Sequence, residues 1–93
     1  MFERSLSFPE VKRILQQLGF RYGTASPEEA KSPVPQIVFV HDRTDTLFVF
    51  PATTVVVDPA RVESIRRILV ARGVVAEDVI NGMFESSPRI TVA

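Results

Sequence analysis

The 93-residue sequence contains no cysteine, no tryptophan and a single histidine, His41. Without cysteine the chain has no disulfide, no thiolate nucleophile and no cysteine-ligated zinc. A single histidine also excludes every metal site that needs two histidine ligands. We therefore expect neither a metal ion nor any other cofactor.

An excess of charge of one sign is also lacking, because 11 Lys and Arg residues balance 11 Asp and Glu residues. A formal net charge of zero argues against strong nonspecific affinity for nucleic acid, although a local patch can override it. No apolar run is long enough to span a membrane, and residues 1–4 do not begin a signal peptide. We expect one globular domain over residues 1–93, in the cytoplasm and without a membrane partner. A domain of this size buries only about 60–65% of its unfolded surface, which favours oligomerisation.

The first third of the chain predicts a helix followed by a loop. Ser7 and Glu10 have the spacing of a capping box, and apolar residues recur at three- and four-residue steps over 8–18. A short strand is expected over 20–22. Residues 23–35 carry one Gly and three Pro among polar side chains, which predicts a long flexible loop.

The middle of the chain predicts a β-hairpin. Residues 36–41 and 46–50 are rich in β-branched and aromatic residues, and the short polar side chains of 42–45 favour a turn between them. Both runs are apolar at consecutive positions, whereas a sheet wetted on one face would alternate. We therefore expect both faces to be covered. Residues 55–57 predict a further short extended segment.

The last third predicts two helices. An N-cap carboxylate and a first-turn proline at 58–59 begin a helix that ends at Gly73. Gly73, like Gly19 in the first third, is expected just past its helix in a left-handed conformation. The predicted buried stripe of this helix consists of Val62, Ile65, Ile68 and Leu69. A shorter helix is expected over 76–84, and residues 86–93 form a tail.

With two or three strands between helices, the economical packing is an α+β fold: a small antiparallel sheet with helices packed on one face. Side chains alternate along each strand of the hairpin. Ile37, Phe39 and His41 therefore oppose Val38 and Val40, while Leu47 and Val49 oppose Phe48 and Phe50. Only one set in each strand can meet the helices, so we predict that something covers the outer face. A second copy of the chain is the first candidate, then a protein partner, then the tail around Ile90 and Val92.

His41 is the first candidate for a general base, because only its side chain titrates near neutral pH when unperturbed. The favoured interpretation is an exposed residue without catalytic function, at the mouth of the hairpin beside Asp42. Carboxylate pairs at 42 and 45 and at 28–29 could hold a metal or transfer protons, but acidic residues are common in surface turns and loops. We expect no metal site there.

The helix that begins at 58–59 is basic, which suggests contact with RNA phosphates. Its candidate RNA-binding residues are Arg61, Arg66 and Arg67. At about 100° per residue, Arg66 and Arg67 diverge to different sides and do not form one stripe with Arg61. A solvated helix surface is the favoured interpretation.

Several short segments occur in a recognisable order along residues 8–82. They are Val11-Lys12-Arg13-Ile14-Leu15, Leu18-Gly19-Phe20, Ile37-Val38-Phe39-Val40-His41, Val49-Phe50-Pro51, Ser64-Ile65-Arg66-Arg67-Ile68-Leu69, Arg72-Gly73-Val74 and Glu77-Asp78. Their conjunction resembles the HicA-type toxins of bacterial toxin–antitoxin pairs. The resemblance implies a double-stranded-RNA-binding-like fold with the same order of helices and sheet.

Members of that family are messenger-RNA endoribonucleases, and they depend on a histidine in a Gly-Ser-His motif at the start of the second strand. Val34-Pro35-Gln36 stands at that place here, and Gln36 cannot take a proton as imidazole can. The resemblance therefore implies a HicA-like domain that has lost its ribonuclease activity and acts through protein–protein association, with an antitoxin-like partner or with itself. The alternatives are an RNA-binding protein or endoribonuclease that uses His41, and a domain with no ligand site.

Overall fold

The computed structural model describes residues 5–85, which form an α+β fold as predicted. Along the chain, the elements are β1 (Leu6–Ser7), α1 (Phe8–Gln17), β2 (Arg21–Ala25), α2 (Pro27–Ala30), β3 (Gln36–His41), the 3-10 turn η1 (Asp42–Thr44), β4 (Thr46–Pro51), β5 (Val56–Val57), α3 (Pro59–Ala71) and α4 (Glu77–Glu85).

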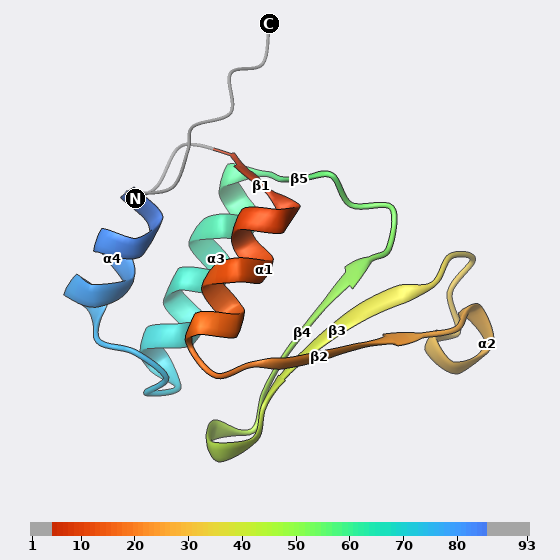
Figure 1. The fold of residues 1–93 in the computed structure, drawn as a ribbon, viewed down its shortest axis with the longest axis horizontal. Coiled ribbons are helices and arrows are strands. Elements are labelled where there is room, and N and C mark those ends of the chain that lie inside the picture. Colours follow the sequence, from red (N-terminus) through yellow and green to blue (C-terminus); the bar gives the residue numbers. More distant parts are fainter. Residues whose placement is uncertain (1–4, 86–93) are drawn as a thin grey trace, which may run out of the picture.

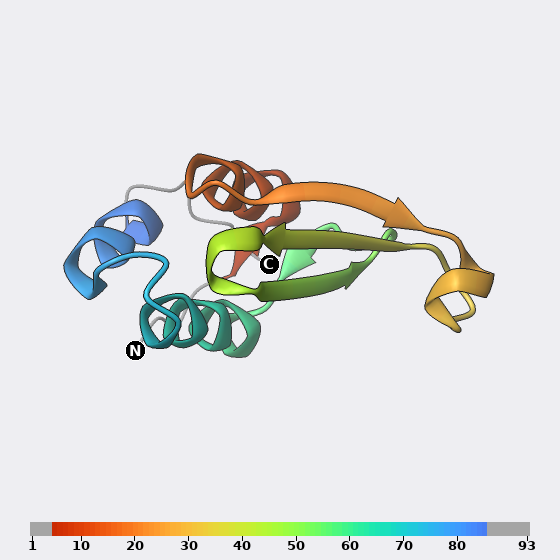
Figure 2. The ribbon, with the colours of Figure 1, turned by 90° about the horizontal axis from the view of Figure 1, so that it is seen from below.

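The main sheet is antiparallel and has the strand order β2-β3-β4. Its register aligns Tyr22 with Phe39 and Phe39 with Phe48. Helices α1, α3 and α4 lie on one side of this sheet, as Figure 1 shows, with α1 toward β2 and α3 toward β4 in the view of Figure 2, while the single turn α2 lies at the far end of β2. The predicted packing of helices on one face is confirmed.

A second, two-stranded sheet joins the beginning of the chain to the segment before α3. Leu6 of β1 pairs with Val57 of β5, and the backbone N–H of Phe8 donates to the carbonyl oxygen of Val55 over 2.8 Å. The sequence predicted an extended segment at 55–57 but not its partner. The pairing places the start of α1 beside the segment that leads into α3.

The core lies between the helices and the inner face of the main sheet. Phe8 from α1 meets the rings of Phe39 and Phe50, with centroid distances of 6.1 and 5.5 Å. The buried apolar side chains are Leu6, Phe8, Val11, Ile14, Leu15, Phe20, Phe39, Phe48, Phe50, Val57, Val62, Ile65, Leu69, Ile80 and Phe84. Every helix longer than one turn in the described part of the chain contributes to this core.

Local signals in the sequence set the ends of α1 and α3. The hydroxyl oxygen of Ser7 accepts from the backbone N–H of Glu10, and a carboxylate oxygen of Asp58 accepts from the backbone N–H of Arg61. Gly19 and Gly73 follow the two helices with φ values of +95° and +73°, which confirms their predicted left-handed conformation.

Two predictions about local structure are wrong. Residues 23–35 are not one polar loop, because β2 continues through Ala25 against β3, and Ser26 and Glu29 then cap the single turn α2 with a complete capping box. The breaker-rich composition hid this cap. Ile68 does not belong to the buried stripe of α3, since its side chain is 37% exposed. The expected tail 86–93, with Ile90 and Val92, lies outside the described residues.

Candidate functional site

The outer face of the main sheet carries a cluster of aliphatic side chains. Val38 and Val40 of β3 lie opposite Val49 and Leu47 of β4 in the register. We call these four residues the outer patch. Leu47 is 58% exposed and Val49 is 36% exposed. Among the described residues, no element lies in front of this face in Figure 2.

The outer patch is bordered at one end by an ion pair. Arg21 of β2 donates from Nε and Nη2 to the two carboxylate oxygens of Asp42, over 2.7 and 2.9 Å. This hydrogen-bonded guanidinium lowers the pKa of the Asp42 carboxyl, with the charges of Arg21 and His41 acting in the same direction. The two charges neutralise each other, so this border adds little net charge to the face.

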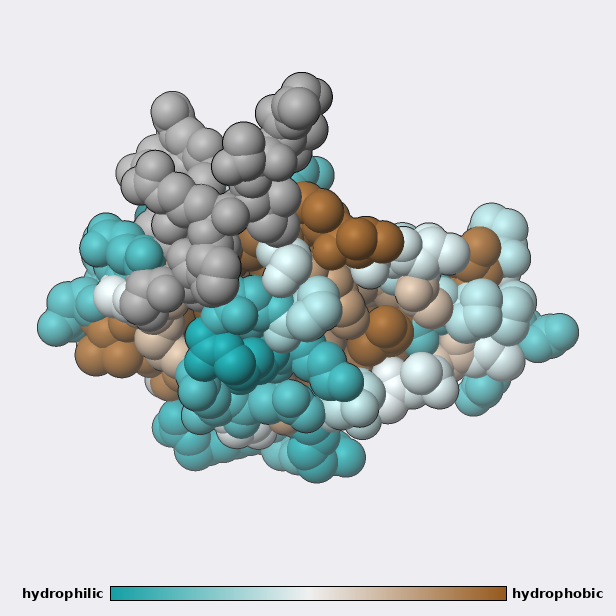
Figure 3. Space-filling view, turned by 45° about the horizontal axis from the view of Figure 1, so that its top comes forward, coloured by the Kyte–Doolittle hydropathy of each residue, from teal (hydrophilic) through white to brown (hydrophobic). Residues whose placement is uncertain are grey.

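Other exposed aliphatic residues do not extend the patch. Val55, just before β5, is 73% exposed, Val56 in β5 is 43% exposed, and Val79 on α4 is 51% exposed. Figure 3 views the molecule from the side of β5 and shows hydrophobic surface broken up by hydrophilic residues. Single apolar side chains of this kind are ordinary on protein surfaces.

His41 is buried, contrary to the prediction of an exposed residue. It lies on the inner face of β3, is 6% exposed, and packs against Phe20 with the ring centroids 5.0 Å apart and the ring planes tilted by 42°. Its Nδ1 forms a 2.7 Å hydrogen bond with the hydroxyl of Thr44, which in turn contacts that of Thr46 at 2.7 Å. Alternation along β3 places the ring on the same face as Phe39, and the structure shows that this face is the inner one. This environment positions His41 as a support of the hairpin turn.

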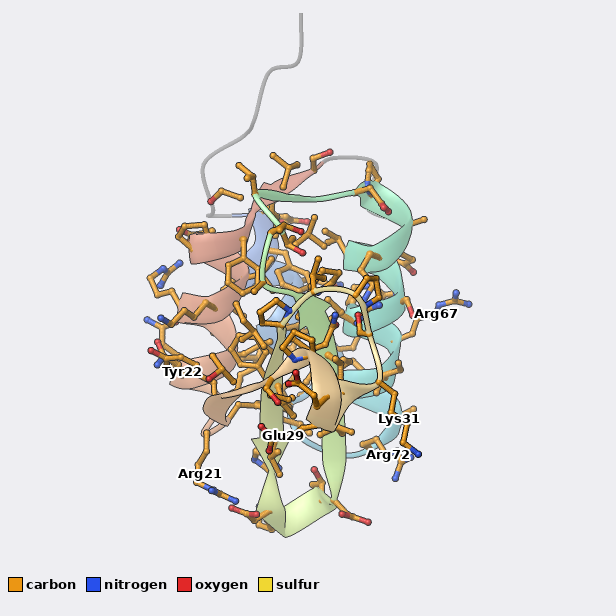
Figure 4. All side chains as sticks on the ribbon, turned by 90° about the vertical axis from the view of Figure 1, so that its right-hand side faces the viewer. Arg21, Tyr22, Glu29, Lys31, Arg67 and Arg72 are labelled. Atoms are coloured by element: carbon orange, nitrogen blue, oxygen red, sulfur yellow. The ribbon has the colours of Figure 1, made fainter. Side chains whose placement is uncertain are left out.

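The three candidate RNA-binding arginines differ in their hydrogen-bond partners and in their exposure. Arg66 is hydrogen-bonded through Nε and Nη2 to both carboxylate oxygens of Glu63, and its side chain is 15% exposed. Arg61 donates to the carbonyl oxygen of Val49. Arg67 is 71% exposed and extends from α3 into solvent, on the side of the molecule away from Arg21 in Figure 4. The structure therefore does not gather them into one phosphate-binding surface.

A shallow pocket of about 210 Å³ lies between the end of β4 and the start of α3. Its charged groups are Asp58 and Arg61. The Asp58 carboxylate caps α3, and the Arg61 guanidinium bonds Val49 and covers the ring of Phe50 at 4.7 Å. Both groups thus have structural partners, which explains their positions in the pocket without a ligand.

The acidic pairs serve the backbone and the surface. Asp45 takes a left-handed conformation at the end of η1, with φ +53°, and Asp42 pairs with Arg21. Glu29 accepts from the backbone N–H of Ser26 in the cap of α2, which lowers the pKa of its carboxyl, while Glu28 is exposed. Within residues 5–85, no three His, Asp or Glu side chains come together as a metal site would require.

Comparisons of the chain with protein-family models, with curated proteins and with solved structures find no match. In the part of the chain that the structure describes, no helix has the length and apolar character needed to cross a membrane. The candidate site with the strongest structural support is therefore the outer patch.

Proposed function

We propose that the protein is a HicA-like domain without ribonuclease activity that acts through protein–protein association, and that its outer patch packs against a second copy of the chain. The observation that carries the proposal is the open face formed by Val38, Val40, Leu47 and Val49. Burying such a face removes apolar surface from water, which is the main driving force of association.

A second copy suits this face because of its charge. The four side chains of the outer patch are uncharged, and the bordering Arg21 and Asp42 compensate each other. The chain as a whole has no net charge, so two copies do not repel each other at neutral pH. A two-fold interface requires a surface that is complementary to itself, and a neutral aliphatic face meets that condition.

The size of the face predicts a weak complex. Three strands spaced about 4.8 Å apart, one of five and two of six residues, at about 3.3 Å per residue cover roughly 270 Å². A stable interface buries about 800 Å² on each partner. Face-to-face packing alone therefore predicts association in the micromolar range or weaker, which dilution reverses.

The buried His41 and the paired Arg66 support association over the alternative of RNA cleavage. Gln36, at the position of the family's catalytic histidine, supports it further, since an amide cannot act as a general base. Salt-dependent binding of single-stranded RNA, strongest at low salt, would instead favour the RNA-binding alternative.

The experiment compares Leu47→Glu with the wild-type chain by size-exclusion chromatography with light scattering. Leu47 is exposed in the single chain, so a glutamate there leaves the fold intact but introduces like charges into the packed faces. We expect the variant to have a lower average mass at the same concentration.

Val79→Glu is the matched control, because Val79 is similarly exposed but lies on α4, away from the outer patch. Its mass should equal that of the wild type. Equal masses for wild type and Leu47→Glu would contradict the proposal, as would a loss of mass in both variants.

A further inference from the structure

The two edge strands of the main sheet differ in how well their free backbone groups are protected from pairing with another strand. β4 forms one edge, where Pro51 has no N–H to offer and Arg61 donates to the carbonyl oxygen of Val49 over 3.0 Å. Figure 2 shows α3 on this side of the sheet. Prolines, and side chains that hydrogen-bond the free backbone groups, protect an edge strand against pairing with another strand.

The β2 edge lacks this protection. The strand contains no proline, and the guanidinium of Arg21 is turned back along the sheet to Asp42. Between α1 and α2, no described element runs along the outer edge of β2 in Figure 2. Every residue of β2 except Ala25 is exposed.

The register identifies the backbone groups that this edge presents. The N–H of Ala52 donates to the carbonyl oxygen of Pro35 over 2.8 Å. Hydrogen-bonded pairs alternate with non-bonded pairs along an antiparallel ladder, so counting in twos from Pro35 makes Phe39 a residue that is hydrogen-bonded to β4. The alternate residues, Val38 and Val40, then bond β2.

It follows that Arg21 and Gly23 face β3 through their N–H and C=O groups, whereas those of Tyr22 and Thr24 point away from the sheet. Phe20, two residues before Tyr22, has the same parity, and its N–H indeed leaves the sheet and donates to Leu15 of α1. Outside the ladder with β3, the structure records no backbone bond for Tyr22 or Thr24 among the described residues.

We propose that the β2 edges of two copies pair antiparallel about Gly23, which joins two three-stranded sheets into one sheet of six strands. Tyr22 of each copy then faces Thr24 of the other, and each such pair exchanges two backbone hydrogen bonds. The two Gly23 residues meet at the axis, where the strands approach most closely and the missing side chains leave room.

Charge complementarity identifies the occupant as a second copy. Lys12, whose Nζ bonds the Tyr22 hydroxyl over 2.9 Å, lies beside the start of β2, and Glu28 and Glu29 follow its end. Antiparallel pairing brings the basic start of one strand to the acidic end of the other. Arg21 then lies opposite Ala25 of the other copy, so no like charges face each other across the junction.

This contact is independent of the outer patch, and one set of variants separates the two. Thr24→Pro removes an edge N–H without removing a bond to β3, which an edge strand tolerates. Thr24→Val keeps the N–H and serves as the matched control. Both changes are made in the Leu47→Glu chain, where the face contact is lost, and molar masses are measured by sedimentation equilibrium.

We expect Leu47→Glu and Leu47→Glu/Thr24→Val to reach the mass of a dimer at high concentration. Leu47→Glu/Thr24→Pro should stay at the mass of one chain. If Leu47→Glu is a monomer at every concentration, edge pairing is wrong while the outer-patch contact stands. If Leu47→Glu matches the wild type and only Thr24→Pro lowers the mass, edge pairing stands and the outer-patch contact is wrong.

Amide hydrogen exchange tests the pairing without relying on the proline variant. The N–H groups of Tyr22 and Thr24 should exchange at least about tenfold more slowly in concentrated than in dilute protein, because pairing buries them. Unchanged fast exchange of both amides over the same dilution would overturn the proposal.

Discussion

Arg61, in the first turn of α3, donates from Nη2 to the backbone carbonyl oxygen of Val49 in β4, and its guanidinium lies 4.7 Å from the centre of the Phe50 ring. A residue that the sequence offered as an RNA contact therefore ties a helix to the edge of the sheet. The bond occupies a carbonyl that faces away from β3, so it also shields that edge from other strands.

Replacing Arg61 with alanine should lower the free energy of unfolding by about 1–2 kcal/mol, because a charge-assisted hydrogen bond and a cation–π contact are lost. Arg67→Ala is the control, since the Arg67 side chain is 71% exposed. That change should stay within about 0.5 kcal/mol of the wild type. Urea unfolding measures both, and equal stabilities of the two variants would show that the Arg61 contacts contribute nothing.

Two glycines should respond to alanine in opposite directions. Gly73 has φ +73°, so Gly73→Ala should cost about 1 kcal/mol even though nothing lies within 4 Å of an added Cβ. Gly82 lies inside α4 with nothing within 4 Å of an added Cβ, so Gly82→Ala should stabilise the protein by about 0.5–1 kcal/mol. Thermal unfolding decides, and a stabilising Gly73→Ala would refute the left-handed helix end.

His41→Ala should destabilise the fold by about 1–3 kcal/mol, because it removes the ring contact with Phe20 and the hydrogen bond to Thr44. Arg43→Ala, at an exposed position in the same turn, is the control and should have little effect. Chemical unfolding measures the difference. Unchanged stability of His41→Ala, combined with loss of an RNA-cleaving activity, would instead assign His41 a catalytic role.

The Arg21–Asp42 pair predicts a pH dependence of stability. Since the hydrogen bond from Arg21 lowers the pKa of Asp42 below its ordinary value of 3.8, the pair stabilises the fold above that pH. The stabilisation is lost as the pH falls through the lowered pKa of the folded state. Asp42→Asn should thus be slightly less stable than the wild type at neutral pH, and the difference should vanish in acid. The pair is exposed, so the effect is small.

The contradicting result for this pair is a difference between Asp42→Asn and the wild type that stays constant from neutral pH into acid, down to about pH 2. Urea unfolding at a series of pH values measures it. A carbon-detected NMR titration of the Asp42 carboxyl in Arg21→Gln is an independent check, because the pKa should move back up toward its ordinary value.

The elements that local rules govern could be predicted from the sequence. The bounds of β3 match the predicted 36–41, and α1 and α3 begin and end within two residues of their predicted limits, because Ser7, Asp58 and the two left-handed glycines act within a turn. Strand alternation also predicted which side chains share a face within each strand of the hairpin, but not which of the two sets faces outward.

Features that depend on tertiary contacts could not be predicted. Ala25 belongs to β2 because β3 pairs with it, although its neighbours are polar and rich in turn residues. His41 was grouped by alternation with Ile37 and Phe39 but expected to be exposed, because nothing in its own segment reveals the Phe20 ring that packs against it. The Arg61 bond to Val49 spans twelve residues and leaves no mark in either segment.

The most direct test of the central claim is sedimentation equilibrium of the wild-type chain and Leu47→Glu from about 1 μM to about 1 mM, the range expected for a weak interface. If the chain self-associates, the average mass of the wild type rises with concentration above the 10.4 kDa of one chain, and at the highest concentrations it exceeds the average mass of Leu47→Glu. A wild-type mass that stays at 10.4 kDa throughout the series would contradict it.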